Sequence, residues 1–169
     1  YYLDLAESAE DELTGPERDQ WLARLRDERL NLRAALEWGL ESGRAELSLR
    51  LGAALWRFWL SEGSLREGRS WLERALAAGD DAPVSIRARA LHFLGNLALD
   101  LGDGAHARAL YQASLALRRE LGDRQSIATS LNGLGLVASN EGDYETARRL
   151  HEECLEILRE VGNRHLEAI

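Results

Sequence analysis

The chain repeats a ten-residue phrase at a distance of forty residues. The segment "LALRRELGDR" at 115–124 returns as "LEILREVGNR" at 155–164. The match extends upstream, since many apolar, glycine and arginine positions of 91–115 recur over 131–155. Self-similarity with a period between about 20 and 50 residues is typical of arrays in which each repeat is one supersecondary unit. This feature predicts an array of stacked units rather than one core built from unrelated segments.

Each unit is predicted to be a pair of helices. Apolar or small residues at 91, 94, 95 and 98 are spaced by three and four, which places them on one helical face. Gly102 and Asp103 then interrupt this helix, and a second helix is expected over 105–120, with Gly122 as its C-terminal cap. The second unit follows the same plan and is expected to end at Gly162.

Two glycines lie inside the predicted first helices, at Gly95 and Gly135. Each costs roughly 1 kcal/mol relative to alanine in a helix interior. We therefore expect both at places where two helices approach so closely that a side chain would hold the pair apart.

A weaker third copy lies upstream, with Trp56 in the place of the first glycine, so this unit is expected to pack differently. The tail repeats the start of a unit and stops, which suggests a piece of a longer chain. We predict a helical N-terminal segment over 1–44 and an array over 45–169. The array divides into an atypical repeat at 47–79, repeats at 85–122 and 125–162, and the start of a truncated repeat at 163–169.

The N-terminal segment has its own pattern. Residues 1–13 are predicted to form a short amphipathic helix, and Pro16 is placed for the start of the next one. An apolar stripe then runs to about residue 42. The stripe fits one long helix over 16–42 equally well as two helices with a kink near 26–28.

Composition narrows the classes of protein. Only two prolines occur in 169 residues, which favours helix. Cys154 is the one cysteine, so no internal disulfide is possible, and a reducing, cytoplasmic location is expected. No apolar run is long enough for a membrane span, and we expect no membrane partner. The formal charge of −8 argues against direct nucleic-acid binding.

Two stretches carry a family resemblance. "LGNLALDLGDGAHARALYQASLAL" and "LGLVASNEGDYETARRLHEECLEI" resemble the tetratricopeptide repeat, in the Leu-Gly pair, the Gly-Asp turn and the Ala that begins the buried face of the second helix. The proline that usually ends the second helix is missing. The resemblance implies an all-α fold, a right-handed α-solenoid of helix hairpins that binds proteins or peptides.

The front of the chain carries a second resemblance. "YYLDLAE" and "WLARLRDERLNLRAALEWGLESG" resemble the region behind the nucleotide-binding module of multidomain bacterial signalling ATPases, which carry DNA-binding domains of the LuxR or SARP type. This implies a sensor or interaction module of a bacterial transcriptional regulator, with other domains of the same chain as further partners. The sequence holds no lysine, so no Walker phosphate-binding loop lies in it.

The repeat architecture places the outward face of each first helix on the concave side of the solenoid. Asn amides can bond both the N–H and the C=O of an extended peptide, and Arg guanidinium groups fit carboxylates. We therefore expect a peptide ligand that is acidic or has a free C-terminus. The candidate ligand-binding residues are Arg50, Arg57, Arg89, His92, Asn96, Thr129, Asn132 and Asn140. Two alternatives stay open: a plain solvated face, and a scaffold that self-associates into a homo-oligomer through Leu60, Leu99 and Leu136.

Other chemistry finds little support in the sequence. His151 and Cys154 could share a helical face as metal ligands, but Tyr111 and Ser114 fill the same repeat positions, so packing is favoured. No nucleophile, base and orienting group stand together, and we expect no catalysis, no cofactor and no metal. A basic cluster is predicted to form a salt-bridged outer face; it comprises Arg118, Arg119, Arg148, Arg149 and Arg159.

Overall fold

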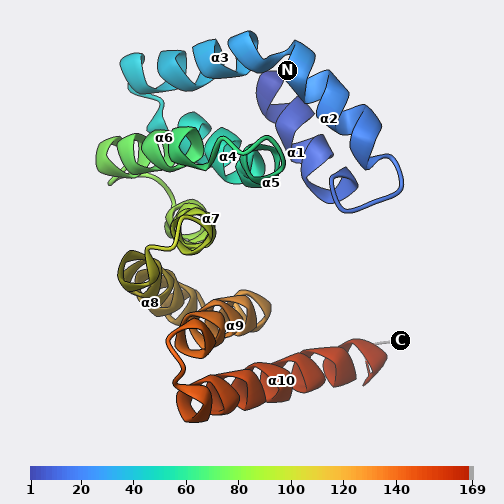
Figure 1. Ribbon diagram of the computed structural model, residues 1–169, viewed down its shortest axis with the longest axis vertical. Helices are drawn as coiled ribbons and strands as arrows, with labels where there is room; N and C mark the ends of the chain where they lie inside the picture. Colours follow the sequence, from blue (N-terminus) through green and yellow to red (C-terminus); the bar gives the residue numbers. More distant parts are fainter. Residues whose placement is uncertain (168–169) are drawn as a thin grey trace.

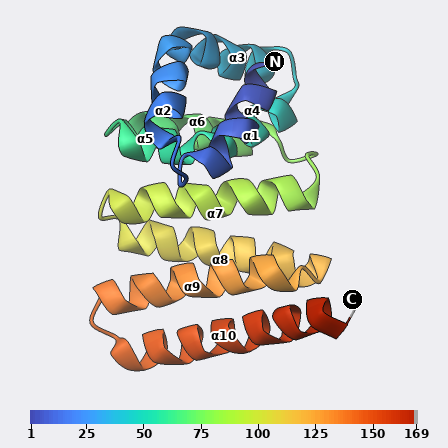
Figure 2. The same cartoon turned by 90° about the vertical axis from the view of Figure 1, so that its right-hand side faces the viewer.

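The computed structural model describes residues 1–167, with side chains as far as Gly162, and every regular element within them is a helix (Figures 1 and 2). Helices α7 to α10 stack in chain order, with the cluster of α1 to α6 at one end and α10 at the other (Figure 2). Their bounds are α1 Tyr2–Glu12, α2 Arg18–Asp27, α3 Arg29–Glu41, α4 Ala45–Ala54, α5 Trp56–Ser61, α6 Leu65–Ala78, α7 Val84–Asp100, α8 Gly104–Leu121, α9 Arg124–Asn140 and α10 Tyr144–Glu167. The predicted all-helical solenoid is confirmed.

The N-terminal segment forms three helices, α1 to α3. The predicted helix over 1–13 is present as α1. The stripe over 16–42 forms two helices, because Glu28 leaves the helical conformation with φ −90° and ψ 3°. Leu22 and Leu25 of α2 and Leu32 and Leu36 of α3 are buried. Ion pairs reinforce this packing, since Arg29 and Arg33 of α3 both bind Glu67 of α6. Arg33 first, and then Arg29, lowers the pKa of Glu67 to about 2.

The atypical repeat differs from the others in its first helix. That helix is divided at Leu55 into α4 and α5, and α6 follows as the second helix. Trp56, Phe58 and Trp59 of α5 are all buried. A Cβ built on Gly68 of α6 would lie 2.3 Å from Cε3 of Trp59, so this glycine makes room for the Trp59 ring. Bulky aromatic packing therefore explains why this copy departs from the repeat pattern.

The two forty-residue repeats are the hairpins α7–α8 and α9–α10. The Gly-Asp pair between their helices has two roles. Gly102 and Gly142 adopt φ of 79° and 81°, which closes each turn in the left-handed region. The carboxylates of Asp103 and Asp143 then accept hydrogen bonds from backbone N–H groups in the first turn of α8 and α10. Gly122 ends α8 with φ 68°, as predicted.

The predicted helix end at Gly162 is wrong. α10 continues through Gly162 to Glu167, so 163–167 extend the last helix rather than begin another one. The remaining part of the expected truncated repeat, 168–169, lies outside the described residues. A Cβ built on Gly162 would have no neighbour within 4 Å, so the position has no contact that requires a glycine.

Glycines inside the array make room for rings of the neighbouring helix. A Cβ on Gly95 of α7 and one on Gly133 of α9 would each lie 2.7 Å from Cε1 of Tyr111, so this ring of α8 is held between two glycines. Gly135 lies in the same way against the His151 ring of α10, at 2.5 Å from Cε1. The expected close approach at Gly95 and Gly135 is confirmed, but its purpose is to admit a side chain. Within residues 1–167, no helix has the length and apolar character needed to cross a bilayer.

Candidate functional site: a groove lined by alternate helices

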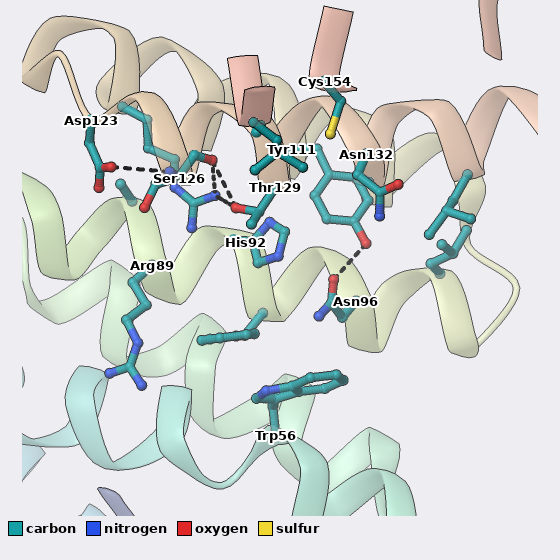
Figure 3. A pocket seen from close by; sticks show the side chains of 18 of the residues that line it. Trp56, Arg89, His92, Asn96, Tyr111, Asp123, Ser126, Thr129, Asn132 and Cys154 are labelled. Carbon is teal, nitrogen blue, oxygen red and sulfur yellow. Dashed lines mark hydrogen bonds between the residues drawn. The ribbon is translucent and has the colours of Figure 1, made fainter. Parts of the chain in front are cut away.

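A cavity of about 1130 Å³ runs along the array. We call it the groove. Its lining comes from α5, which is the latter part of the divided first helix, from the first helices α7 and α9, and from the second helices α8 and α10. Figure 3 shows part of this lining, with His92 in the middle of the labelled side chains. Six of the eight predicted ligand-binding residues line the groove: Arg57, Arg89, His92, Asn96, Thr129 and Asn132.

The other two predicted residues lie elsewhere. Arg50 of α4 forms a bidentate ion pair with Glu7 of α1, with both N–O distances at 3.0 Å. It therefore joins the N-terminal segment to the array. Asn140 is exposed at the last residue of α9, outside the lining of the groove.

Aromatic rings form a continuous strip through the groove. Trp56 of α5 stacks on Phe93 of α7, with ring centroids 5.3 Å apart and planes 15° apart. His92 contacts Phe93 on one side and Tyr111 on the other, at 5.4 Å between centroids in both cases. All four residues belong to the lining. His92 and Phe93 are half-buried and offer apolar ring surface to a ligand, whereas Trp56 and Tyr111 are buried behind it.

The two asparagines of the groove differ in their freedom. The Oδ1 atom of Asn96 accepts a hydrogen bond of 2.8 Å from the hydroxyl of Tyr111 (Figure 3). Asn96 therefore supports the core as well as lining the groove. Asn132 is exposed on α9, and its amide group bonds no partner among the described side chains. Asn132 is accordingly the better placed of the two to bond a ligand.

The arginines on the first helices are partly engaged. Arg89 forms an ion pair with Glu10 of α1, and in Figure 3 its side chain extends away from Asn96 and Asn132. Arg57 lies over the Trp56 ring, 4.5 Å from its centroid, and forms no ion pair with a described carboxylate. Arg57 is therefore a cation that a ligand can reach without displacing an acid.

The prediction that Arg118 belongs to a salt-bridged outer face is wrong. Arg118 is only 6% exposed and lines the groove from the last turn of α8. Its Nη1 atom lies within hydrogen-bond distance of three oxygens at the start of α9: the carbonyl of Ser126 at 2.7 Å and the hydroxyls of Thr129 at 2.6 Å and Ser130 at 2.8 Å. Burial lowers the pKa of Arg118 to about 10, so the group remains a cation at neutral pH.

Two neighbours in the groove keep polar atoms without partners. The indole Nε1 of Trp56 and the Nδ1 of His92 are both buried and unpaired. Burial, and then the charge of Arg118, lowers the pKa of His92 to about 3. His92 is therefore neutral at neutral pH and does not supply the positive charge that its side chain could carry.

Leucines along the groove remain partly in solvent. Leu60 of α5 and Leu136 of α9 are exposed, and Leu99 of α7 is half-buried. α10 adds exposed Leu155 and Leu158. Exposed apolar side chains gathered in one concavity mark interaction sites more often than leucines scattered singly.

His151 and Cys154 take packing positions, as favoured from the repeat. The His151 ring lies against Gly135, and Cys154 belongs to a core cluster with Leu131 and Ile157. Both residues also line the groove. In the part of the chain with described side chains, no group of three or more potential ligands could hold a metal ion.

The second helices were the part of the site that sequence reasoning missed. Tyr111, Ser114 and Arg118 are spaced by three and four and so share one face of α8. The matching residues of α10 are His151, Cys154 and Leu158. Because 111 and 114 were already expected to be buried, the spacing contained a signal that Arg118 points inward. Arg118 also lies near the C-terminus of its helix, where an exposed arginine is favoured by the helix dipole, and this second explanation led to the wrong prediction.

Comparison with known proteins shows which proteins share this sequence pattern and this fold. The Tetratricopeptide repeat family model matches residues 86–166. The protein named "Putative HTH-type transcriptional regulator Mb0914c" of Mycobacterium bovis is 31% identical over 142 residues, which cover 78% of this chain and 16% of that protein. The same values hold for "Putative HTH-type transcriptional regulator Rv0890c" of Mycobacterium tuberculosis. This chain thus spans 16% of the length of these curated relatives.

A solved structure has the same fold. BtubC (BKLC) from P. vanneervenii superposes with a TM-score of 0.67 over 82% of this chain and 58% of that chain, at 18% identity. At this identity the likeness concerns the fold alone. The helix pairs, their glycine and ring contacts, and the family match over the two regular repeats agree with one another. Residues 86–166 match the Tetratricopeptide repeat family, the described residues form a helical solenoid of this kind, and the chain resembles part of proteins named as HTH-type transcriptional regulators.

Proposed function

We propose that the chain is the protein- or peptide-binding sensor module of a bacterial transcriptional regulator, and that the partner lies in the groove. The observation that carries this proposal is the gathering of exposed leucines, an unbroken aromatic strip and unpaired polar atoms in one cavity. The tetratricopeptide repeat is a protein-interaction fold, and the relatives are named as regulators. We place the module in the cytoplasm, where such regulators meet DNA.

The proposed mechanism follows from the stacking of the helices. A partner that contacts α5, α7 and α9 at once touches three successive units. Each unit of a solenoid contacts mainly its neighbours, so small rotations between units add up to a change in curvature. A partner that binds one curvature better than another shifts the population toward it. In a longer regulator, this shift would be passed to the domains on either side.

Self-association through the same leucines is the second candidate function. Leu60, Leu136, Leu155 and Leu158 could cover those of a second copy. Light scattering over a series of concentrations separates the two candidates. A monomer at every concentration would remove the scaffold, and a dimer that covers the groove would count against a separate ligand.

The groove can be tested by selecting peptides that bind it. A library of random peptides is selected on the purified chain, and binders are then measured against two variants. Leu136→Arg places a charge among the exposed leucines of the groove, and Leu30→Arg places one on α3, where Leu30 is 75% exposed and outside the groove. We expect the selected peptides to bind the unchanged chain and Leu30→Arg, and to lose roughly tenfold or more in affinity for Leu136→Arg. Equal loss, or no loss, in the two variants would place the partner elsewhere.

A further inference from the structure

The groove holds a buried positive charge that forms no direct ion pair, although the charge of Asp123 acts on it from farther away. Arg118 forms no ion pair with any carboxylate in the described part of the chain, although only 6% of its surface is exposed. Removing an ion from water costs free energy unless an opposite charge or several hydrogen bonds replace the water. Here Nη1 receives that support from Ser126, Thr129 and Ser130. The other guanidinium nitrogens, Nε and Nη2, donate no hydrogen bond to a described group, and neither is a fully enclosed orphan atom.

This arrangement orients the guanidinium. The three oxygens around Nη1 belong to the first two turns of α9, so the plane of the group is held by a neighbouring helix. The remaining edge, formed by Nε and Nη2, is the edge that binds a carboxylate with two parallel hydrogen bonds. A guanidinium group held in one orientation loses little conformational entropy when a ligand binds. Its two parallel N–H groups favour a planar anion such as a carboxylate over a spherical ion.

Other groups in the groove limit the ligand to a single negative charge. Asp100 and Asp123 also line the groove, Asp100 at the end of α7 and Asp123 at the cap of α9. Arg89 is already paired with Glu10. The cations of the groove that form no ion pair are Arg57 and Arg118, and the charge of Asp123 already acts on Arg118. A ligand with several acidic residues would bring some of its negative charges close to these carboxylates. A ligand with a single negative charge can bind Arg118 without approaching them.

The rest of the groove is suited to an apolar body. Besides Arg118, the lining includes the neutral His92 ring, the Trp56–Phe93 stack and Leu121, which is exposed at the end of α8. The buried Nε1 of Trp56 lacks an acceptor, and a ligand oxygen could supply one. A carboxylate on an aromatic or aliphatic group therefore matches the site better than a sugar or a phosphate.

We propose that Arg118 forms a carboxylate subsite in the groove, and that its ligand is an apolar unit carrying one carboxylate. This rests on the proposed function, under which the unit is the C-terminal residue of a peptide. A free organic acid offers the same chemistry, and the experiment distinguishes the two sources. The sequence predicted an acidic peptide that binds to side chains of the first helices. The proposed subsite instead binds one terminal carboxylate, through an arginine of a second helix, α8.

The test compares acids with their amides in NMR titrations of the whole chain. The probes are the acetylated tetrapeptide AALL with a free or amidated C-terminus, and 4-phenylbutyrate against 4-phenylbutyramide. We expect an acid to bind roughly tenfold or more tightly than its amide, because the charge-assisted bonds exist only with the carboxylate. The indole N–H signal of Trp56, assigned with Trp56→Phe, is expected to shift with the acid.

Variants assign this preference to one arginine. Arg118→Gln is expected to abolish the acid preference. Arg119→Gln is the matched control, since Arg119 is the adjacent residue, exposed and paired with Glu153, and it is expected to keep the preference. Arg118→Lys keeps the charge but loses the two parallel N–H groups of the guanidinium. It is measured as well, so that the test still holds if Arg118→Gln proves unstable.

The outcomes separate the subsite from the proposed function. An acid preference in the peptide pair that depends on Arg118 supports both. The same preference in the phenylbutyrate pair alone supports the subsite and counts against a peptide partner. Equal binding of acid and amide, a preference that survives in Arg118→Gln and Arg118→Lys, or no binding of any probe overturns the subsite. Equal binding of both peptides leaves the proposed function standing.

Discussion

Replacing Tyr111 with alanine is expected to lower the free energy of unfolding by about 3–5 kcal/mol, the usual cost of truncating a buried aromatic side chain. Tyr111 is 1% exposed and fills the space between Gly95 and Gly133. Neither glycine has a side chain that could move into the vacated space, so the cavity is expected to persist. Urea unfolding followed by circular dichroism measures the change.

Two control variants separate the contributions of Tyr111. Tyr111→Phe keeps the ring and removes only the hydroxyl that donates to Asn96, so it is expected to cost about 1 kcal/mol. Tyr144→Ala alters a tyrosine that is 73% exposed at the start of α10, and its effect is expected to stay within about 0.5 kcal/mol. A Tyr111→Ala variant as stable as Tyr144→Ala would contradict the packing between the two glycines.

Replacing Gly133 with alanine is expected to destabilise the chain by about 1–3 kcal/mol. This is the opposite of what helix propensity alone predicts, because alanine favours the helix more than glycine does. The new methyl group would lie 2.7 Å from Cε1 and 2.8 Å from Cζ of Tyr111. The ring cannot retreat freely, because Gly95 lies on its other side and its hydroxyl is bonded to Asn96. Overpacking therefore outweighs the gain of up to about 1 kcal/mol that alanine brings to a helix interior.

Gly162 supplies the matched control for this substitution. It also lies within a helix, α10, but a methyl group added there would lie within 4 Å of no described atom beyond its chain neighbours and the backbone of its own helix. Gly162→Ala is expected to leave stability unchanged or to raise it by up to about 1 kcal/mol. The opposite signs of the two changes are the result to look for in parallel urea curves. A stabilising Gly133→Ala would show that the ring contact is loose.

The repeat allowed the sequence to predict most of the array. A left-handed glycine followed by a capping aspartate is a local device, so it can be recognised from Gly102-Asp103 and Gly142-Asp143 alone. The glycine contacts were also predictable, because a glycine costs helix stability unless packing requires it. The family resemblance then indicated which face of the first helices lines the groove, and six of the eight predicted residues are found there.

The features that could not be predicted depend on neighbouring helices. The break at Leu55 has no proline or glycine to mark it, and it accompanies the packing of Trp56 and Trp59. Arg50 has the right spacing for the groove, but its direction is set by Glu7, which is forty-three residues away. Arg118 turns inward because the start of α9 offers three oxygens to its Nη1 atom. Such partners are fixed only when the array has stacked.

A partner that occupies the groove would cover Cys154, and this thiol therefore tests the central claim most directly. Cys154 is the one cysteine of the sequence, it lines the groove, and it is 7% exposed. The measurement is the rate of its alkylation by iodoacetamide, with and without a saturating amount of a selected peptide. Gln112→Cys adds a control thiol at an exposed position of α8 outside the groove, and mass mapping follows each thiol separately.

We predict that the bound peptide slows alkylation at Cys154 severalfold and leaves the control thiol at position 112 unaffected. Unchanged alkylation of Cys154 under saturating peptide would mean that the partner binds another surface, and the groove would lose its assigned role.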